Sequence, residues 1–189
     1  YSPPPEVKNV TISSGDEYIS FAWEAADVKD FSNYELYYWE TASQSSFSET
    51  CEYTSFSGAT FTLDTPVVGS YPVGSWVELT SNPSGGGEAA KLTLAVALNT
   101  GDSTIVCNYI PTYYDDSGTI KITNPPTPTT ISQRESYRVT GLTNGVTYTF
   151  VLRTVDETGN KSDGVVLTAS PNAEVYDVEN PLTVVPKVR

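Results

Sequence analysis

Histidine is absent from this 189-residue chain, and methionine is absent as well. Without an imidazole base the sequence cannot form a Ser-His-Asp triad or a Cys-His pair, so these nucleophilic mechanisms are excluded. Two cysteines and no histidine are also too few ligands for a structural zinc site. Because a complete translation product begins with methionine, we expect a fragment or a processed chain that has lost any signal peptide, lipid anchor or neighbouring domain.

Positive charge is scarce too, with 10 Lys and Arg against 23 Asp and Glu and a net charge of −13. Such a surface repels phosphate backbones and anionic membranes, so we expect neither nucleic acid nor a membrane surface as a partner. No long apolar run is present, and direct membrane insertion of this chain is not predicted. The triple glycine at 85–87 lacks the lysine and helix of a phosphate-binding loop. We therefore expect no cofactor and no catalytic activity.

Strand-forming residues are abundant, with 13 tyrosines and many Thr, Ser and Val. Residues 18–23 alternate strictly, so that Ile19, Phe21 and Trp23 share one face of an extended segment. A second alternating segment follows at 33–40. Proline and glycine interrupt the sequence too often for a long amphipathic helix. The pattern predicts an all-β fold.

The middle of the chain, residues 43–133, differs from its flanks in being rich in small, polar and turn-forming residues. It predicts an inserted β-rich subdomain with a stiff, proline-rich exit linker at 124–130. Its expected strands are separated by breakers and lie at 60–63, 75–80, 92–98, 104–109 and 119–123.

The flanking segments resemble a fibronectin type III domain of the bacterial type. Leu142, Gly145 and Tyr148 have the spacing of that family's tyrosine corner, and Trp23 is similar to its core tryptophan on strand B. The turn at 154–162 also looks like the connection between strands F and G. The resemblance implies an immunoglobulin-like sandwich whose Tyr148 hydroxyl bonds to nearby backbone.

The expected domain organisation follows from this resemblance. Residues 3–42 and 134–171 form one discontinuous sandwich, and residues 43–133 interrupt it between strands C and E. Residues 172–189 are a C-terminal tail or a linker to a following domain. Loop-closure entropy rises only slowly with length, so a sandwich tolerates an insertion of this size.

The insertion contains both cysteines and the candidate ligand-binding residues. Secreted proteins often pair such cysteines, which predicts a Cys51–Cys107 disulfide, with two buried free thiols as the alternative. Candidate ligand-binding residues cluster near one expected loop: Tyr109, Tyr113, Tyr114, Asp115 and Asp116. The acidic pair suits either Ca²⁺ or a plain turn, and because the spacing of a calcium loop is missing we predict a turn and no metal.

These patterns favour a non-catalytic binding or adhesion module of an extracellular, cell-surface protein such as a bacterial lipoprotein. The expected partner is a protein or a carbohydrate, bound through the insertion, because binding sites are commonly carried on segments added to a rigid scaffold. Two alternatives remain open at the level of sequence. One is a structural spacer in a surface or phage-tail assembly, and the other is an accessory carbohydrate-binding domain of a polysaccharide-degrading enzyme.

Overall fold

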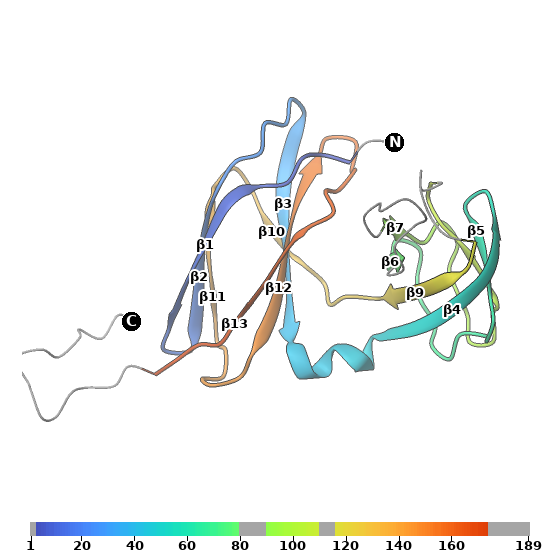
Figure 1. The fold of residues 1–189 in the computed structure, drawn as a ribbon. Coiled ribbons are helices and arrows are strands. Elements are labelled where there is room, and N and C mark those ends of the chain that lie inside the picture. Colours follow the sequence, from blue (N-terminus) through green and yellow to red (C-terminus); the bar gives the residue numbers. More distant parts are fainter. Residues whose placement is uncertain (1–2, 80–89, 110–115, 174–189) are drawn as a thin grey trace, which may run out of the picture. The chain divides into compact units, whose positions relative to one another are not determined.

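The computed structural model describes residues 3–79, 90–109 and 116–173 (Figure 1). The chain divides into two compact units, of which one comprises Ser2–Ala42 with Pro126–Arg189 and the other comprises Ser43–Pro125. We call them the sandwich and the barrel. Both are built from antiparallel strands, and the short 3-10 helix η1 (Thr41–Ser46) lies where the chain passes from one unit to the other. The predicted all-β class is confirmed.

The sandwich consists of two antiparallel sheets. The first has the strand order β1-β2-β11 and the second has the order β10-β3-β12-β13. Their bounds are Lys8–Gly15 (β1), Tyr18–Glu24 (β2), Phe31–Glu40 (β3), Thr129–Ile131 (β10), Ser136–Thr140 (β11), Tyr148–Asp156 (β12) and Val165–Ala169 (β13). None of the described segments is a helix long and apolar enough to cross a bilayer.

Alternating side chains of the two sheets meet in one core. Phe21 of β2 packs edge-on against Phe150 of β12, with ring centroids 4.7 Å apart. Trp23 packs in the same way against Tyr34 of β3, at 5.2 Å. Both flanking segments therefore contribute side chains to the same core. The cluster includes Trp23, Leu36, Leu142, Tyr148 and Phe150, and Tyr38 is partly buried at its margin.

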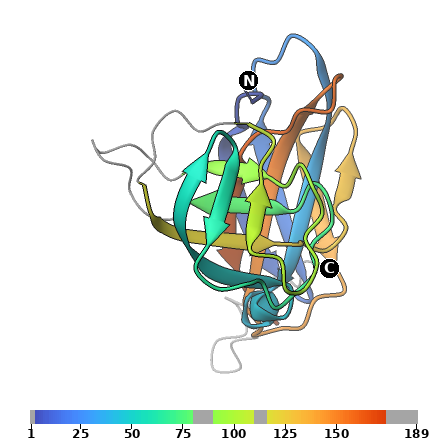
Figure 2. The same cartoon turned by 90° about the vertical axis from the view of Figure 1, so that its right-hand side faces the viewer.

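The barrel is a six-stranded sheet that closes on itself (Figure 2). Its strand order is β7-β6-β9-β4-β5-β8. Beyond the end of β7, Leu94 forms an antiparallel bridge with Cys107, which follows β8. Backbone bonds from Ala95 N to Val106 O (2.8 Å) and from Asn108 N to Thr93 O (3.0 Å) complete this contact. The strands are Ser48–Ser57 (β4), Thr60–Leu63 (β5), Trp76–Leu79 (β6), Lys91–Thr93 (β7), Thr104–Val106 (β8) and Gly118–Thr123 (β9).

A second hydrophobic core fills the barrel and is separate from that of the sandwich. It contains aromatic and aliphatic side chains with exposed fractions near zero, among them Tyr53, Phe61, Leu94, Ile105, Ile120 and Ile122. The strands by which the chain enters and leaves the barrel, β4 and β9, pair with each other, and Ser48 lies opposite Thr123. Just outside them, the Asn124 N–H donates to the Phe47 carbonyl at 2.9 Å. The chain therefore enters and leaves the barrel at the same place.

The boundary expected after residue 133 is wrong, because residues 126–133 belong to the sandwich. The presumed exit linker contains β10, whose Thr129 pairs with Leu36 of β3 and whose Ile131 is fully buried. The barrel is accordingly inserted between β3 and β10, and a strand separates it from β11. The sequence pattern did not predict this strand, because prolines come directly before it. The β-branched residues that follow these prolines form the strand. Of the expected C-terminal tail, residues 174–189 lie outside the described part.

The predicted disulfide is also wrong, since Cys51 and Cys107 are free thiols. Cys51 lies early in β4 opposite Ile120, whereas the Cys107 N–H donates to the Ala59 carbonyl just beyond the far end of that strand. At about 3.3 Å per residue, Cys51 is about 20 Å from Ser57, where β4 ends. A disulfide requires Cα atoms within about 7 Å, so the barrel core holds the two cysteines too far apart.

Both thiols are expected to remain reduced and to react slowly in the native protein. Burial, together with the Glu49 carboxylate, raises the pKa of Cys51 to about 11, and burial raises that of Cys107 to about 12. Little thiolate is then present at neutral pH. Iodoacetamide labelling followed by intact-mass measurement should show Cys51, which is half-buried, reacting before the buried Cys107. A native mass lacking two hydrogens, restored by reductant, would contradict this arrangement.

Candidate functional site

The predicted tyrosine-corner residues lie together at the crossover from β11 to β12. The Tyr148 hydroxyl accepts a hydrogen bond from the Thr143 N–H at 3.0 Å, which is the type of contact the sequence pattern predicts. Leu142 is buried in the sandwich core. Gly145 has a φ of 81°, in the left-handed region where a side chain is disfavoured, and its N–H donates to the Pro171 carbonyl. These three residues therefore stabilise the fold of the sandwich.

Replacing Tyr148 by phenylalanine should lower the free energy of unfolding by about 1–2 kcal/mol, because the Thr143 N–H loses its partner. Urea denaturation measures the change. Tyr38→Phe is the matched control, since the Tyr38 hydroxyl has no hydrogen bond to a described residue and its ring lies at the edge of the same core. Equal losses in the two variants would show that the Tyr148 hydroxyl contributes nothing specific.

The candidate ligand-binding residues of the barrel are only partly described. Tyr113, Tyr114 and Asp115 lie outside the described residues. The half-buried Tyr109 donates its hydroxyl proton to the Lys91 carbonyl at 2.8 Å, which supports the barrel wall, and Asp116 is exposed. Within residues 3–79, 90–109 and 116–173, no group of three or more Cys, Asp or Glu side chains is placed to hold a metal ion.

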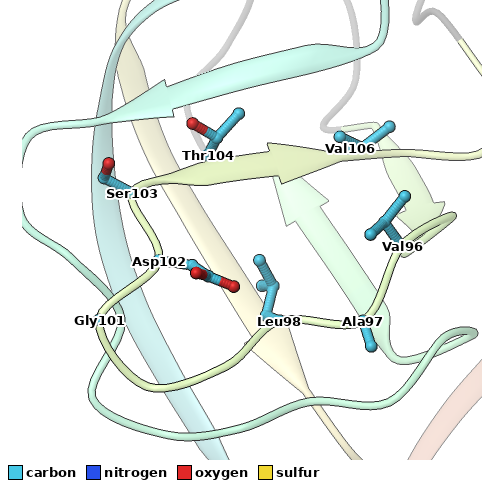
Figure 3. A pocket seen from close by; sticks show the side chains of 8 residues that line it. All are labelled: Val96, Ala97, Leu98, Gly101, Asp102, Ser103, Thr104 and Val106. Atoms are coloured by element: carbon cyan, nitrogen blue, oxygen red, sulfur yellow. The ribbon is translucent and has the colours of Figure 1, made fainter.

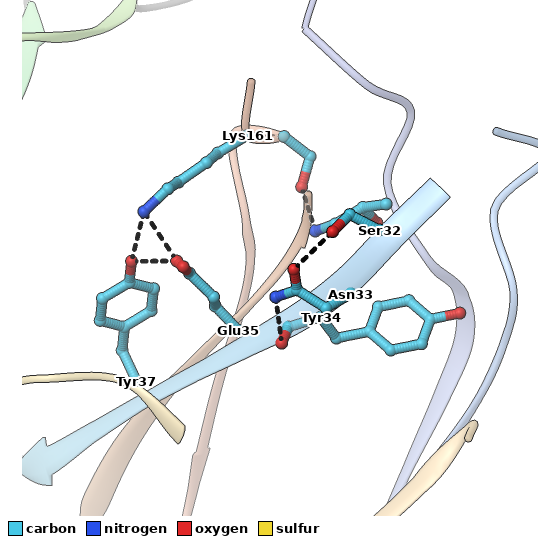
Figure 4. A network of polar contacts seen from close by, with 8 residues as sticks. Ser32, Asn33, Tyr34, Glu35, Tyr37 and Lys161 are labelled. Atoms are coloured by element: carbon cyan, nitrogen blue, oxygen red, sulfur yellow. Dashed lines mark hydrogen bonds and ion pairs between the residues drawn. The ribbon is translucent and has the colours of Figure 1, made fainter. Parts of the chain in front are cut away.

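A polar network lies on the face of β3 that points away from the sandwich core (Figure 4). The Lys161 ammonium lies 2.9 Å from the Glu35 carboxylate, and the Tyr37 hydroxyl donates to the same carboxylate. Burial and this acidic neighbour raise the pKa of Tyr37. The Arg153 guanidinium lies 5.9 Å from the centre of the Tyr37 ring. Because these groups interact with one another, the network is best explained as a structural link between β3 and the connection from β12 to β13.

A hollow of about 390 Å³ opens on the barrel (Figure 3). Figure 3 shows Val96 and Val106 together at one end and Asp102 near the other. Its lining residues are Val96, Ala97, Leu98, Gly101, Asp102, Ser103, Thr104 and Val106. Three valines near this region are largely exposed: Val68 (81%), Val73 (62%) and Val96 (54%).

Backbone hydrogen bonds join the two segments that carry these valines. Residues 67–74 run antiparallel to residues 94–101, with bonds from Gly101 N to Val67 O and from Gly74 N to Leu94 O. Between them, Tyr71 and Leu98 form a bridge with two 2.9 Å bonds. The exposed valines are thus presented on ordered backbone.

Glu49 of β4 ties the same segment to the barrel wall. Its carboxylate accepts hydrogen bonds from Val68 N (3.0 Å), Gly69 N (2.8 Å) and the Tyr71 hydroxyl (2.7 Å). Partial burial by itself would raise the pKa of Glu49, but these bonds outweigh it and hold the pKa below its ordinary value. A side chain at position 69 would crowd both Tyr71 and Glu49, which explains the glycine there.

A second hollow, of about 470 Å³, lies on the outer face of β2 and β11 in the sandwich. It is lined by Ser20, Phe21, Arg134, Ser136, Tyr137 and Arg138. The guanidinium of Arg138 lies 4.1 Å from the centre of the Tyr18 ring, and that of Arg134 lies 5.4 Å from the centre of the Tyr137 ring. Sequence reasoning missed this site. The available signal was two arginines close together in a chain with only 10 basic residues.

No protein-family model matches the chain, and no curated protein matches it either. The hollow with exposed valines belongs to the barrel, whereas the hollow with arginines belongs to the sandwich.

Proposed function

We propose that the chain is a non-catalytic, extracellular binding module of a bacterial surface protein, in which a fibronectin type III-like sandwich carries a barrel that contacts a protein partner. The strand order supports this proposal, because strands in the positions of A, B and E share one sheet and those of C, F and G share the other. The bonded Tyr148 at the crossover supports it further.

The exposed valines of the barrel are the observation that carries the binding function. Val68, Val73 and Val96 are exposed although the other large apolar side chains described in the barrel are buried or half-buried. Exposed apolar groups on an ordered surface are typical of protein–protein contacts. Because backbone bonds and Glu49 already order the segment, little conformational entropy is lost on binding.

Charge indicates the kind of protein that fits this surface. The barrel segment 43–125 has only two basic residues, Lys91 and Lys121, and Asp102 lies in the hollow itself. A complementary partner has an apolar centre surrounded by Lys and Arg. Its association should weaken as salt is added, since screening reduces the attraction between the charged rims.

A displayed library of short peptides tests the proposal on the intact chain. Peptides selected by the native protein should combine Lys or Arg with large apolar residues. Changing both Val73 and Val96 to aspartate should weaken the selected peptides about tenfold or more, as expected when a contact worth about 1.4 kcal/mol is lost.

Val166→Asp is the matched control, because Val166 of the sandwich is similarly exposed at 55% and lies outside the barrel. Binding that survives the barrel variant but is lost in the control would overturn the proposal. If the native protein selects no peptide, the structural-spacer alternative is favoured instead.

A further inference from the structure

The outer face of the sandwich has a feature that a scaffold does not require. Arg134 and Arg138 are exposed and line one hollow, and neither makes an ion pair with any residue that the structure describes. None of the residues lining the hollow is acidic, although the chain has a net charge of −13. Glu135, which lies between them in sequence, accepts a hydrogen bond from the Tyr34 hydroxyl. The two positive charges are therefore left available to a ligand.

Arg138 is held in place before any ligand arrives. The Tyr18 ring lies against Gly15, where any Cβ would overlap it, and the Cζ atom of Arg138 lies over this ring, 4.1 Å from its centre. The Nε of Arg138 also donates to the Ser20 hydroxyl at 2.9 Å. Nε is bonded and the guanidinium lies over the ring, while the two terminal amino groups have no hydrogen-bond partner among the described residues. An ordered guanidinium of this kind loses little entropy on binding.

We propose that this hollow binds a single carboxylate carried by a sugar, with Arg138 as the anchoring residue. The planar guanidinium presents parallel N–H donors that match the two oxygens of a carboxylate. The negative field of the whole chain disfavours dense polyanions, so an isolated charge on an otherwise neutral ligand is favoured over a polyphosphate or polysulfate.

The remaining lining residues suit a hydroxylated ring. Ser136 is exposed, and its hydroxyl has no hydrogen-bond partner among the described residues. The Ser20 hydroxyl accepts from Arg138 and keeps its own proton to donate. Arg134 adds a second cation at the margin, where its guanidinium lies 5.4 Å from the centre of the Tyr137 ring, which itself packs against the sandwich core. This site is on the sandwich and does not depend on the barrel surface proposed above.

Titration with methyl glucuronide, followed by the arginine Nε–H signals in ¹H–¹⁵N spectra, tests the proposal. The Arg138 signal should shift and saturate, whereas methyl glucoside, which lacks the carboxylate, should leave it unmoved. Arg138→Lys keeps the charge but loses the paired donors, so the affinity should fall about tenfold. Ser20→Ala should lower it by a smaller factor, because only the bond that orients Nε is removed.

Lys121→Gln is the control for charge, because it alters the net charge by one unit and Lys121 belongs to the barrel and does not line the hollow. It should bind as the native chain does. N-acetylalanine supplies the carboxylate of a peptide terminus, and inorganic phosphate supplies a different oxyanion. Binding of either as tightly as the glucuronide would overturn the sugar assignment. Undiminished binding by Arg138→Lys, or no shift at millimolar glucuronide, would overturn the site.

Discussion

Replacing Phe150 by alanine should lower the free energy of unfolding by about 3–5 kcal/mol. Phe150 has no exposed surface and lies at the centre of the sandwich core. Its ring centre is 4.7 Å from that of Phe21, 5.9 Å from that of Tyr38 and 6.4 Å from that of Tyr148. The substitution removes these aromatic contacts and leaves a cavity between two sheets that are hydrogen-bonded along their strands and cannot easily collapse into it.

Urea denaturation monitored by circular dichroism measures this loss. Val166→Ala serves as the control, because Val166 belongs to the neighbouring strand β13 but is 55% exposed, and it should change stability by no more than about 0.5 kcal/mol. Similar losses in the two variants would mean that Phe150 is not in a tightly packed core.

Replacing Glu49 by alanine should destabilise the barrel by about 2–3 kcal/mol, because two backbone N–H groups and the Tyr71 hydroxyl lose a charged acceptor together. The same change should loosen the segment carrying the exposed Val68. Hydrogen exchange of the Val68 and Gly69 amides in the native and variant chains measures the local effect, while urea denaturation measures the global one.

The contribution of Glu49 should also depend on pH in a defined direction. The pKa of Glu49 is lower in the folded chain than in the unfolded chain, where the pKa of a glutamate is about 4.3. The stabilisation is therefore present above that value and is lost as the pH falls through the pKa of the folded state. Glu49→Gln, which keeps the shape but has no charge to titrate, should differ most from the native chain at neutral pH and least in acid. A difference that grows in acid would contradict the assigned hydrogen bonds.

Local pattern was sufficient to predict several strands. Residues 60–63 were expected as a strand and form β5, and residues 119–123 were expected as a strand and lie within β9. In both places, turn-forming residues flank a short segment that contains β-branched residues. The alternation of Ile19, Phe21 and Trp23 likewise predicted the face of β2 that enters the core. In each case the information lies within a few neighbouring residues.

Features that depend on distant segments were not predictable. Closure of the barrel depends on Leu94 meeting Cys107, and no local pattern encodes that pairing. The same closure determines where the cysteines lie, so counting them could not show that they are far apart. The arginine hollow requires Tyr18, Gly15 and Ser20 to assemble beneath Arg138. By contrast, Leu142, Gly145 and Tyr148 are close in sequence, and their spacing was informative.

The pairing of Ser48 with Thr123 has an evolutionary consequence. When the two ends of an inserted unit lie on adjacent strands, these ends are about as close together as the ends of a short hairpin turn. The strands on either side of the insertion therefore need little change in position. The entropy lost in closing the long connection is offset by contacts within the inserted unit. A segment of this design can be exchanged as a cassette by recombination, because the sandwich has to supply only two chain ends that lie close together.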